Sequence, residues 1–265
     1  MTAVDEHYLS DSVSECETLQ YDVAEPFKAN ARVKPRTFTL STTTITQMNS
    51  RKYGEPAENF SVDWNIFEDP NFTGAVTLTR EEPDGVDAAY YDSKINAAER
   101  GVYSITCAGS SGSSHNTIMT TMKQLSLTPG LGNFGLKDSL LRGKWNIQPL
   151  NKEGKYKKLA TPAFALKRDK DMILWTGEHG NEVAESMVLQ DGTRVLITKE
   201  SIRRIDFDLL IASWVALIWQ FRALGEYEGK PFDTEYFAKR ESLANEDKGM
   251  SSASVRSAIN GKAMF

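Results

Sequence analysis

Cysteine and histidine are scarce in this chain. Its 265 residues include two cysteines, Cys16 and Cys107, and three histidines, His7, His115 and His179. The first cysteine lies in an acidic stretch and the second in a predicted strand, so we expect no structural disulfide and a reducing, cytoplasmic environment. The histidines are widely spaced, and no Cys-x-x-Cys or His-Glu-x-x-His pattern occurs. We therefore expect no metal site and no cofactor.

An excess of positive charge is also lacking. The chain has 31 Lys and Arg against 36 Asp and Glu, a formal net charge of −5. Nucleic-acid binders are usually basic, so we expect no nucleic-acid partner. Residues 1–25 hold seven acids and no Lys or Arg; the acids are Asp5, Glu6, Asp11, Glu15, Glu17, Asp22 and Glu25. We interpret residues 1–35 as a disordered acidic arm without a secretory signal.

No apolar run approaches the roughly 20 residues that a transmembrane helix needs. The most apolar segment covers residues 209–219 and reads Leu-Leu-Ile-Ala-Ser-Trp-Val-Ala-Leu-Ile-Trp. As a helix it would be apolar on every side, which requires that it be enclosed by protein. We predict a core helix near residues 206–224, with Asp206 or Asp208 capping its start and Gly225 ending it.

Short β-strands dominate the predicted structure between residues 36 and 200. Alternating patterns and turn residues predict strands at 37–40, 60–66, 75–79, 102–107, 115–122, 124–128, 144–148, 163–168, 172–176, 183–189 and 194–198. Asp191 and Gly192 mark a hairpin turn. No amphipathic helix separates the strands, which argues against an α/β fold. A closed barrel is the geometry that surrounds a helix on all sides, so we predict a mainly β fold, an antiparallel closed barrel over residues 36–224. Residues 225–265 are predicted to form a short helix and a flexible tail.

Several of these segments resemble a known family. They are the strands Met172-Ile-Leu-Trp, Val183-Ala-Glu-Ser-Met-Val-Leu and Val195-Leu-Ile, followed by Asp206-Phe-Asp-Leu-Leu-Ile-Ala-Ser-Trp-Val-Ala-Leu. Together with the early hairpin at residues 62–71, they are similar to the tubby C-terminal-like architecture of tubby proteins, LURP-one-related proteins and phospholipid scramblases. The resemblance implies roughly 10–12 antiparallel strands closed around a C-terminal helix, and a membrane-linked or regulatory role. No binding residue of the family can be matched to a position in this chain.

The best candidate site is a basic block at residues 142–170. It contains nine bases, including Arg142 and Lys144, against the two acids Glu153 and Asp169. Each base near an anionic membrane contributes about 1 kcal/mol to binding. We hypothesise that an anionic lipid surface binds Lys152, Lys155, Lys157, Lys158, Lys167, Arg168 and Lys170. An acidic protein partner and a hairpin that is merely solvated remain as alternatives, and the acidic arm is hypothesised to mask the block.

Two weaker patterns point elsewhere. Ala108-Gly-Ser-Ser-Gly follows a predicted strand and approximates a nucleophile elbow, with Ser110 as the nucleophile of a serine hydrolase. His115 or His179 would be its base, and Asp138, Asp169 or Asp171 would orient the base. A β-pattern follows it where the elbow requires a helix, so a plain turn is favoured. Gly130-Leu-Gly-Asn-Phe-Gly lacks a preceding strand and is interpreted as a loop. We predict a non-enzymatic binding or regulatory module, peripheral at a membrane; the alternatives are a protein-interaction or structural domain without a ligand, and the hydrolase.

Overall fold

The structure is a computed structural model that describes residues 32–48, 58–69, 74–81, 101–109, 118–125, 131–139 and 143–225. The predicted arm up to residue 31 and the predicted tail from residue 226 lie outside these ranges. The same is true of Cys16, His115, Ser110 and Arg142.

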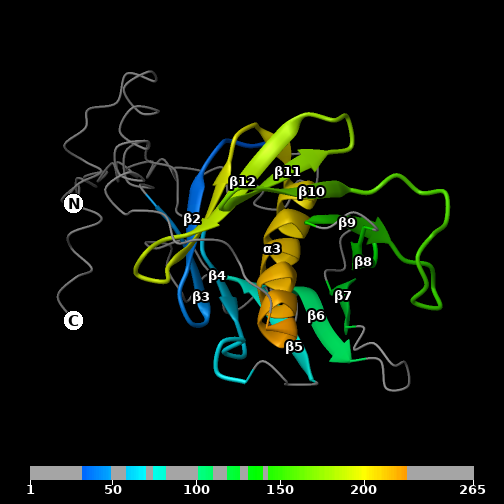
Figure 1. Ribbon diagram of the computed structural model, residues 1–265, viewed down its shortest axis with the longest axis horizontal. Helices are drawn as coiled ribbons and strands as arrows, with labels where there is room; N and C mark the ends of the chain where they lie inside the picture. Colours follow the sequence, from blue (N-terminus) through cyan, green and yellow to red (C-terminus); the bar gives the residue numbers. More distant parts are fainter. Residues whose placement is uncertain are drawn as a thin grey trace, which may run out of the picture.

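Twelve antiparallel strands form a closed barrel (Figure 1). Each strand pairs with the next along the chain, and β13 pairs with β2 to close the barrel. The strands are β2 (Thr37–Leu40), β3 (Thr44–Gln47), β4 (Phe60–Val62), β5 (Ala75–Arg80), β6 (Gly101–Gly109), β7 (Ile118–Gln124), β8 (Phe134–Asp138), β9 (Lys144–Pro149), β10 (Phe164–Asp169), β11 (Met172–Gly177), β12 (Glu182–Val188) and β13 (Arg194–Thr198). A separate two-stranded sheet pairs β1 (Arg32–Val33) with β14 (Ile202–Arg203). Closure of the barrel removes the unpaired edges that an open sheet would expose.

A single long helix, α3 (Arg204–Leu224), runs through the barrel (Figure 1). Every residue from Leu209 to Phe221 is buried, so the helix is enclosed on all sides as its composition predicts. Inward strand residues such as Phe38 and Phe60 pack against Phe207, with ring centroids 5.4 and 6.0 Å apart. By length and composition α3 is the one helix of the described chain that could cross a membrane, but 78% of its apolar window is buried inside the protein. It therefore serves as the core of the barrel.

The two ends of α3 differ in how well the sequence predicts them. Gly225 ends the helix in a left-handed conformation with φ 62°, as expected. The predicted cap by Asp206 or Asp208 is wrong, because the helix begins earlier and its N-cap residue Arg203 makes no side-chain cap hydrogen bond. Asp206 lies within the first turn, so its negative charge is at the favourable end of the helix dipole. Its carboxylate also accepts hydrogen bonds from the Arg203 guanidinium.

The sequence also misses two strands of the barrel. The strand β3 is only four residues long and mixes threonine with glutamine, while β8 contains glycine and follows a glycine-rich loop. In the predicted strand 124–128, Gln124 is the last residue of β7 and Leu125 lies outside it. Asp63 and Trp64 lie in a bend, so β4 is shorter than the predicted strand at 60–66. Short strands with a weak pattern depend on their neighbours for stability, which local sequence does not reveal.

Candidate functional site

The lysine loop, defined as residues 150–163, connects β9 to β10 and protrudes from the wall of the barrel (Figure 1). Strands β9 and β13 run in the same direction, so the lysine loop lies at the barrel end where α3 begins. Its tip is a tight turn in which the Asn151 side chain accepts hydrogen bonds from the backbone of Glu153 and Lys155, at 3.0 and 2.9 Å. Gly154 takes φ 75°, which a glycine adopts without strain. The turn residues thus define the conformation of the tip.

Two side chains hold the lysine loop against the barrel. The Tyr156 hydroxyl donates to the Leu136 carbonyl of β8 at 2.9 Å, and its ring lies over Gly135, where an added Cβ would come within 2.9 Å of Tyr156 Cε1. From β9, Gln148 Nε2 donates to the carbonyls of Ala160 at 2.6 Å and Lys157 at 3.2 Å. Burial raises the pKa of the Tyr156 phenol, so the hydroxyl keeps the proton that it donates.

The anchored lysine loop presents its basic side chains to solvent. Lys152, Lys155, Lys157 and Lys158 are exposed. The Lys155 ammonium lies 3.1 Å from the Glu153 carboxylate, an ion pair in which both side chains are more than two-thirds exposed and which is therefore weak. Four lysines against one acid leave this short loop with a strong local positive charge.

A further lysine, which the sequence did not single out, joins this surface from β8. Lys137 is exposed, and its ammonium lies 5.5 Å from the centre of the Tyr156 ring. We call the exposed set of Lys137, Lys152, Lys155, Lys157 and Lys158 the lysine surface. The signal for Lys137 is absent from the local sequence because the pairing of β8 with β9, and the return of Tyr156 over β8, bring it there.

The rest of the predicted site lies elsewhere on the barrel. Lys167 and Lys144 are direct cross-strand partners on β10 and β9, and Lys170 occupies the turn after β10 at the opposite end from the lysine loop. Arg168 points inward, with its guanidinium 5.5 Å from the Trp145 ring centre and 5.4 Å from that of Phe221. The structure therefore divides the described bases of the basic block into three parts. They are the exposed lysines of the lysine loop, the inward Arg168, and a set that we call the lower strand group, consisting of Lys144, Lys167 and Lys170.

Leu159 is an unexpected feature of the lysine loop. Its relative exposure is 101%, against 40% for Trp64 and 36% for Leu125, the other exposed large hydrophobic residues of the described chain. It directly follows Lys157 and Lys158. The sequence did not single out this residue, and only its position relative to the barrel shows that no described residue covers it.

A compact charged cluster closes the barrel where α3 begins. Arg80 pairs with Asp208, Arg204 pairs with Glu58, and the Arg36 guanidinium lies 3.3 Å from the Glu58 carboxylate. The side chains of these five residues are 12–17% exposed. Burial raises the pKa of the Asp208 carboxyl, and the neighbouring Arg80 acts in the opposite direction. Each carboxylate of the cluster is paired with an arginine, so we assign this cluster a structural role.

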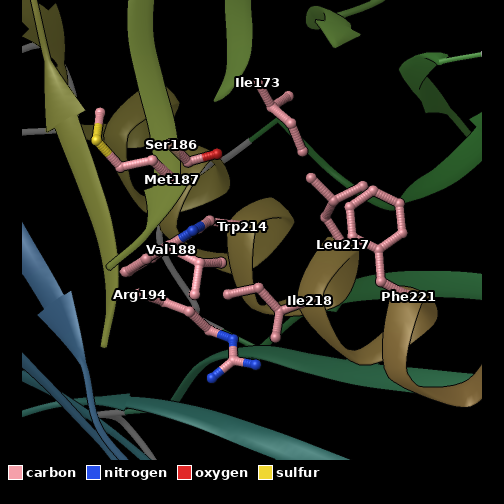
Figure 2. A pocket seen from close by; sticks show the side chains of 9 residues that line it. All are labelled: Ile173, Ser186, Met187, Val188, Arg194, Trp214, Leu217, Ile218 and Phe221. Atoms are coloured by element: carbon pink, nitrogen blue, oxygen red, sulfur yellow. The ribbon is translucent and has the colours of Figure 1, made fainter. Parts of the chain in front are cut away.

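One small pocket lies between α3 and strands β11 to β13 (Figure 2). It is lined by Ile173, Ser186, Met187, Val188, Arg194, Trp214, Leu217, Ile218 and Phe221. Figure 2 shows mostly apolar side chains around it, with the Ser186 hydroxyl and the Arg194 guanidinium as polar groups. Its free space accepts roughly one water molecule, so a lipid tail or a cofactor does not fit beside Trp214 without repacking.

The acids proposed as partners of Ser110 lie at one end of the barrel, and the described candidate base, His179, lies at the other. Gly109, the last residue of β6, lies at the end opposite the start of α3, as does Asp171 in the turn after β10. His179 lies in the turn between β11 and β12, at the end where α3 begins. This separation gives His179 no access to Asp171, and Ser110 itself is outside the described residues. Within the described ranges, no group of three or more His, Cys, Asp or Glu side chains is arranged to hold a metal ion.

The chain matches no family model, no curated protein and no solved structure. The architecture is nevertheless compatible with the resemblance described above, because both consist of a closed antiparallel barrel around a C-terminal helix. The assignment of a site therefore depends on the geometry of this molecule alone.

Proposed function

We propose that this protein is a non-enzymatic binding module that attaches to anionic membrane surfaces through the lysine surface. The observation that carries the proposal is the anchored lysine loop, where four exposed lysines stand on a backbone held by Tyr156 and Gln148. A held loop loses little conformational freedom when it binds, so more of the electrostatic attraction is realised as affinity. The tubby-like resemblance supports the same role, since it implies a membrane-linked or regulatory protein.

Lysine is suited to this target. An ammonium is a compact charge on a flexible stem, and it attracts a diffuse layer of lipid phosphates without requiring one fixed geometry. A protruding loop can contact the surface of an anionic membrane, whereas a small anionic ligand requires a concave site. The small pocket shown in Figure 2 is not formed by residues of the lysine surface.

Sedimentation with vesicles tests the proposal. The triple variant Lys155→Glu, Lys157→Glu, Lys158→Glu removes three attractive charges and adds three repulsive ones. At about 1 kcal/mol per base, loss of the attraction alone lowers affinity by roughly 150-fold for vesicles that contain phosphatidylserine. Wild-type binding should weaken as salt is raised and vanish on vesicles of phosphatidylcholine alone.

A charge-matched control separates the two lysine groups. Lys144→Glu, Lys167→Glu, Lys170→Glu changes the net charge by the same amount on the lower strand group. This control should retain most of the binding. Both variants should melt near the wild-type temperature, because five of the six substituted lysines are exposed and Lys144 is half-buried. Equal losses in the two variants would show that net charge matters and that the lysine loop has no special role.

A further inference from the structure

The position of Leu159 indicates how the lysine loop would engage a membrane. A leucine that is 101% exposed has no described neighbour that shields it from water. Isolated apolar side chains on a surface are common and need no explanation on their own. Leu159 differs because it lies on a loop that is anchored on both sides of it and is flanked by cations.

The backbone around Leu159 is held in a tight turn. Gln148 Nε2 donates to the carbonyls of Lys157 and Ala160, the residues two before and one after Leu159, and the Ala160 amide donates to the Lys157 carbonyl at 3.4 Å. Gln148 itself is 7% exposed. The leucine is therefore presented outward by a buried anchor, and the turn does not have to order itself on contact with a ligand.

The residues next to Leu159 match the chemistry of the lipid headgroup region. Lys157 and Lys158 are exposed and have long apolar stems with a charged end. Such side chains place their charge among phosphates while their stems follow an inserted apolar residue. Tyr156, three residues before Leu159, is half-buried against the barrel. Its hydrogen bond to β8 fixes the position of Lys157, Lys158 and Leu159 relative to the barrel wall.

We propose that Leu159 inserts into the hydrocarbon region of an anionic bilayer while Lys157 and Lys158 contact the lipid phosphates. This inference rests on the proposed function and adds an apolar contact to it. A soluble acidic protein offers negative charge but no hydrocarbon layer. The apolar contact of Leu159 therefore distinguishes a bilayer from an acidic protein as the partner. The wall of the barrel from which the lysine loop protrudes then faces the membrane (Figure 1).

The test compares Leu159→Ser with wild type on two probes. The first probe is a phosphatidylcholine vesicle with phosphatidylserine, and the second is soluble polyglutamate. The variant should lose roughly tenfold in affinity for the vesicles and keep its affinity for polyglutamate. Leu125→Ser is the matched control, because Leu125 is also exposed and should change neither measurement. A second variant, Leu159→Trp, should bind at least as well as wild type and show extra fluorescence quenching by lipids brominated on their acyl chains.

The outcomes separate the two proposals. Equal vesicle affinity of wild type and Leu159→Ser, or no additional quenching in Leu159→Trp, overturns insertion and leaves electrostatic binding standing. Loss of polyglutamate and vesicle binding together in Leu159→Ser, with an unchanged melting temperature, also overturns it. Absence of vesicle binding by the wild-type chain overturns the proposed function and the insertion with it.

Discussion

Ala216 shows what enclosure means for a single residue. It has no accessible surface, and it lies in the middle of the buried part of α3. A carboxylate at this position would be surrounded by apolar side chains. A buried charge without a partner is strongly destabilising.

Ala216→Asp is therefore expected to lower the free energy of unfolding by about 3–5 kcal/mol. Urea denaturation followed by tryptophan fluorescence measures this change. Ala165→Asp is the control, because Ala165 is exposed on β10, and its effect should stay within about 0.5 kcal/mol. If Ala216→Asp is as stable as the control, α3 is not the core of the barrel.

Single residues of the candidate site were foreseen to different degrees. The sequence predicts that Lys155, Lys157 and Lys158 are exposed, because they lie in a polar turn between strands. The sequence analysis places Arg168 and Lys167 in the same binding set. In the structure Lys167 faces outward and Arg168 faces inward. The alternation of β10 and the aromatic rings of Trp145 and Phe221 decide this, and those rings come from distant parts of the chain.

The conformation of the lysine loop depends on its contacts with strand β8. Gly135 on β8 leaves space for the Tyr156 ring, and the ring and hydroxyl anchor the lysine loop. A methyl group at this position would meet Tyr156 Cε1 at 2.9 Å and Leu150 Cδ2 at 3.3 Å. The ring must shift, so the hydrogen bond to Leu136 is expected to be lost.

Gly135→Ala should thus increase hydrogen exchange of the amides in residues 150–163 and lower affinity for anionic vesicles by roughly fivefold, the equivalent of one hydrogen bond. Tyr156→Phe is the comparison variant, since it removes the hydroxyl and keeps the ring. It should increase exchange less than Gly135→Ala does. Unchanged exchange in both variants would mean that Tyr156 does not hold the lysine loop.

At the scale of the whole molecule, charge is distributed unevenly between the chain's N-terminal arm and its barrel. Residues 1–25 contain seven acids and no Lys or Arg. The arm joins the described structure at Arg32 in β1, which pairs with β14 just before α3 begins. The arm is therefore attached at the same barrel end as the lysine loop, which suits the hypothesis that it masks the lysine surface.

Deletion of residues 1–31 is expected to raise affinity for anionic vesicles several-fold at low salt, with a smaller effect at high salt because exposed charges are screened. The deletion stops at residue 31 because β1 and the Arg36 ion pair belong to the folded part. Removal of residues 226–265, which follow the opposite end of α3, serves as the control and should leave affinity unchanged. Equal affinity with and without the arm would exclude masking.

The class of fold follows from local features of the sequence. An all-round apolar helix and a series of short alternating strands admit few arrangements, because the helix must be enclosed and the strands must lose their edges. The apolar helix and the alternating strands are both local patterns, so they can be recognised from the order of the residues alone.

The position of the lysine surface depends on tertiary contacts. Strand pairing brings Lys137 to the lysine loop, turns Arg168 inward, and leaves Leu159 uncovered beside two lysines. These outcomes depend on register and on contacts between residues far apart in the chain. A shift of one residue in a strand reverses which side chains face outward. The sequence therefore shows how many bases the basic block contains, but it does not show which of them face outward together.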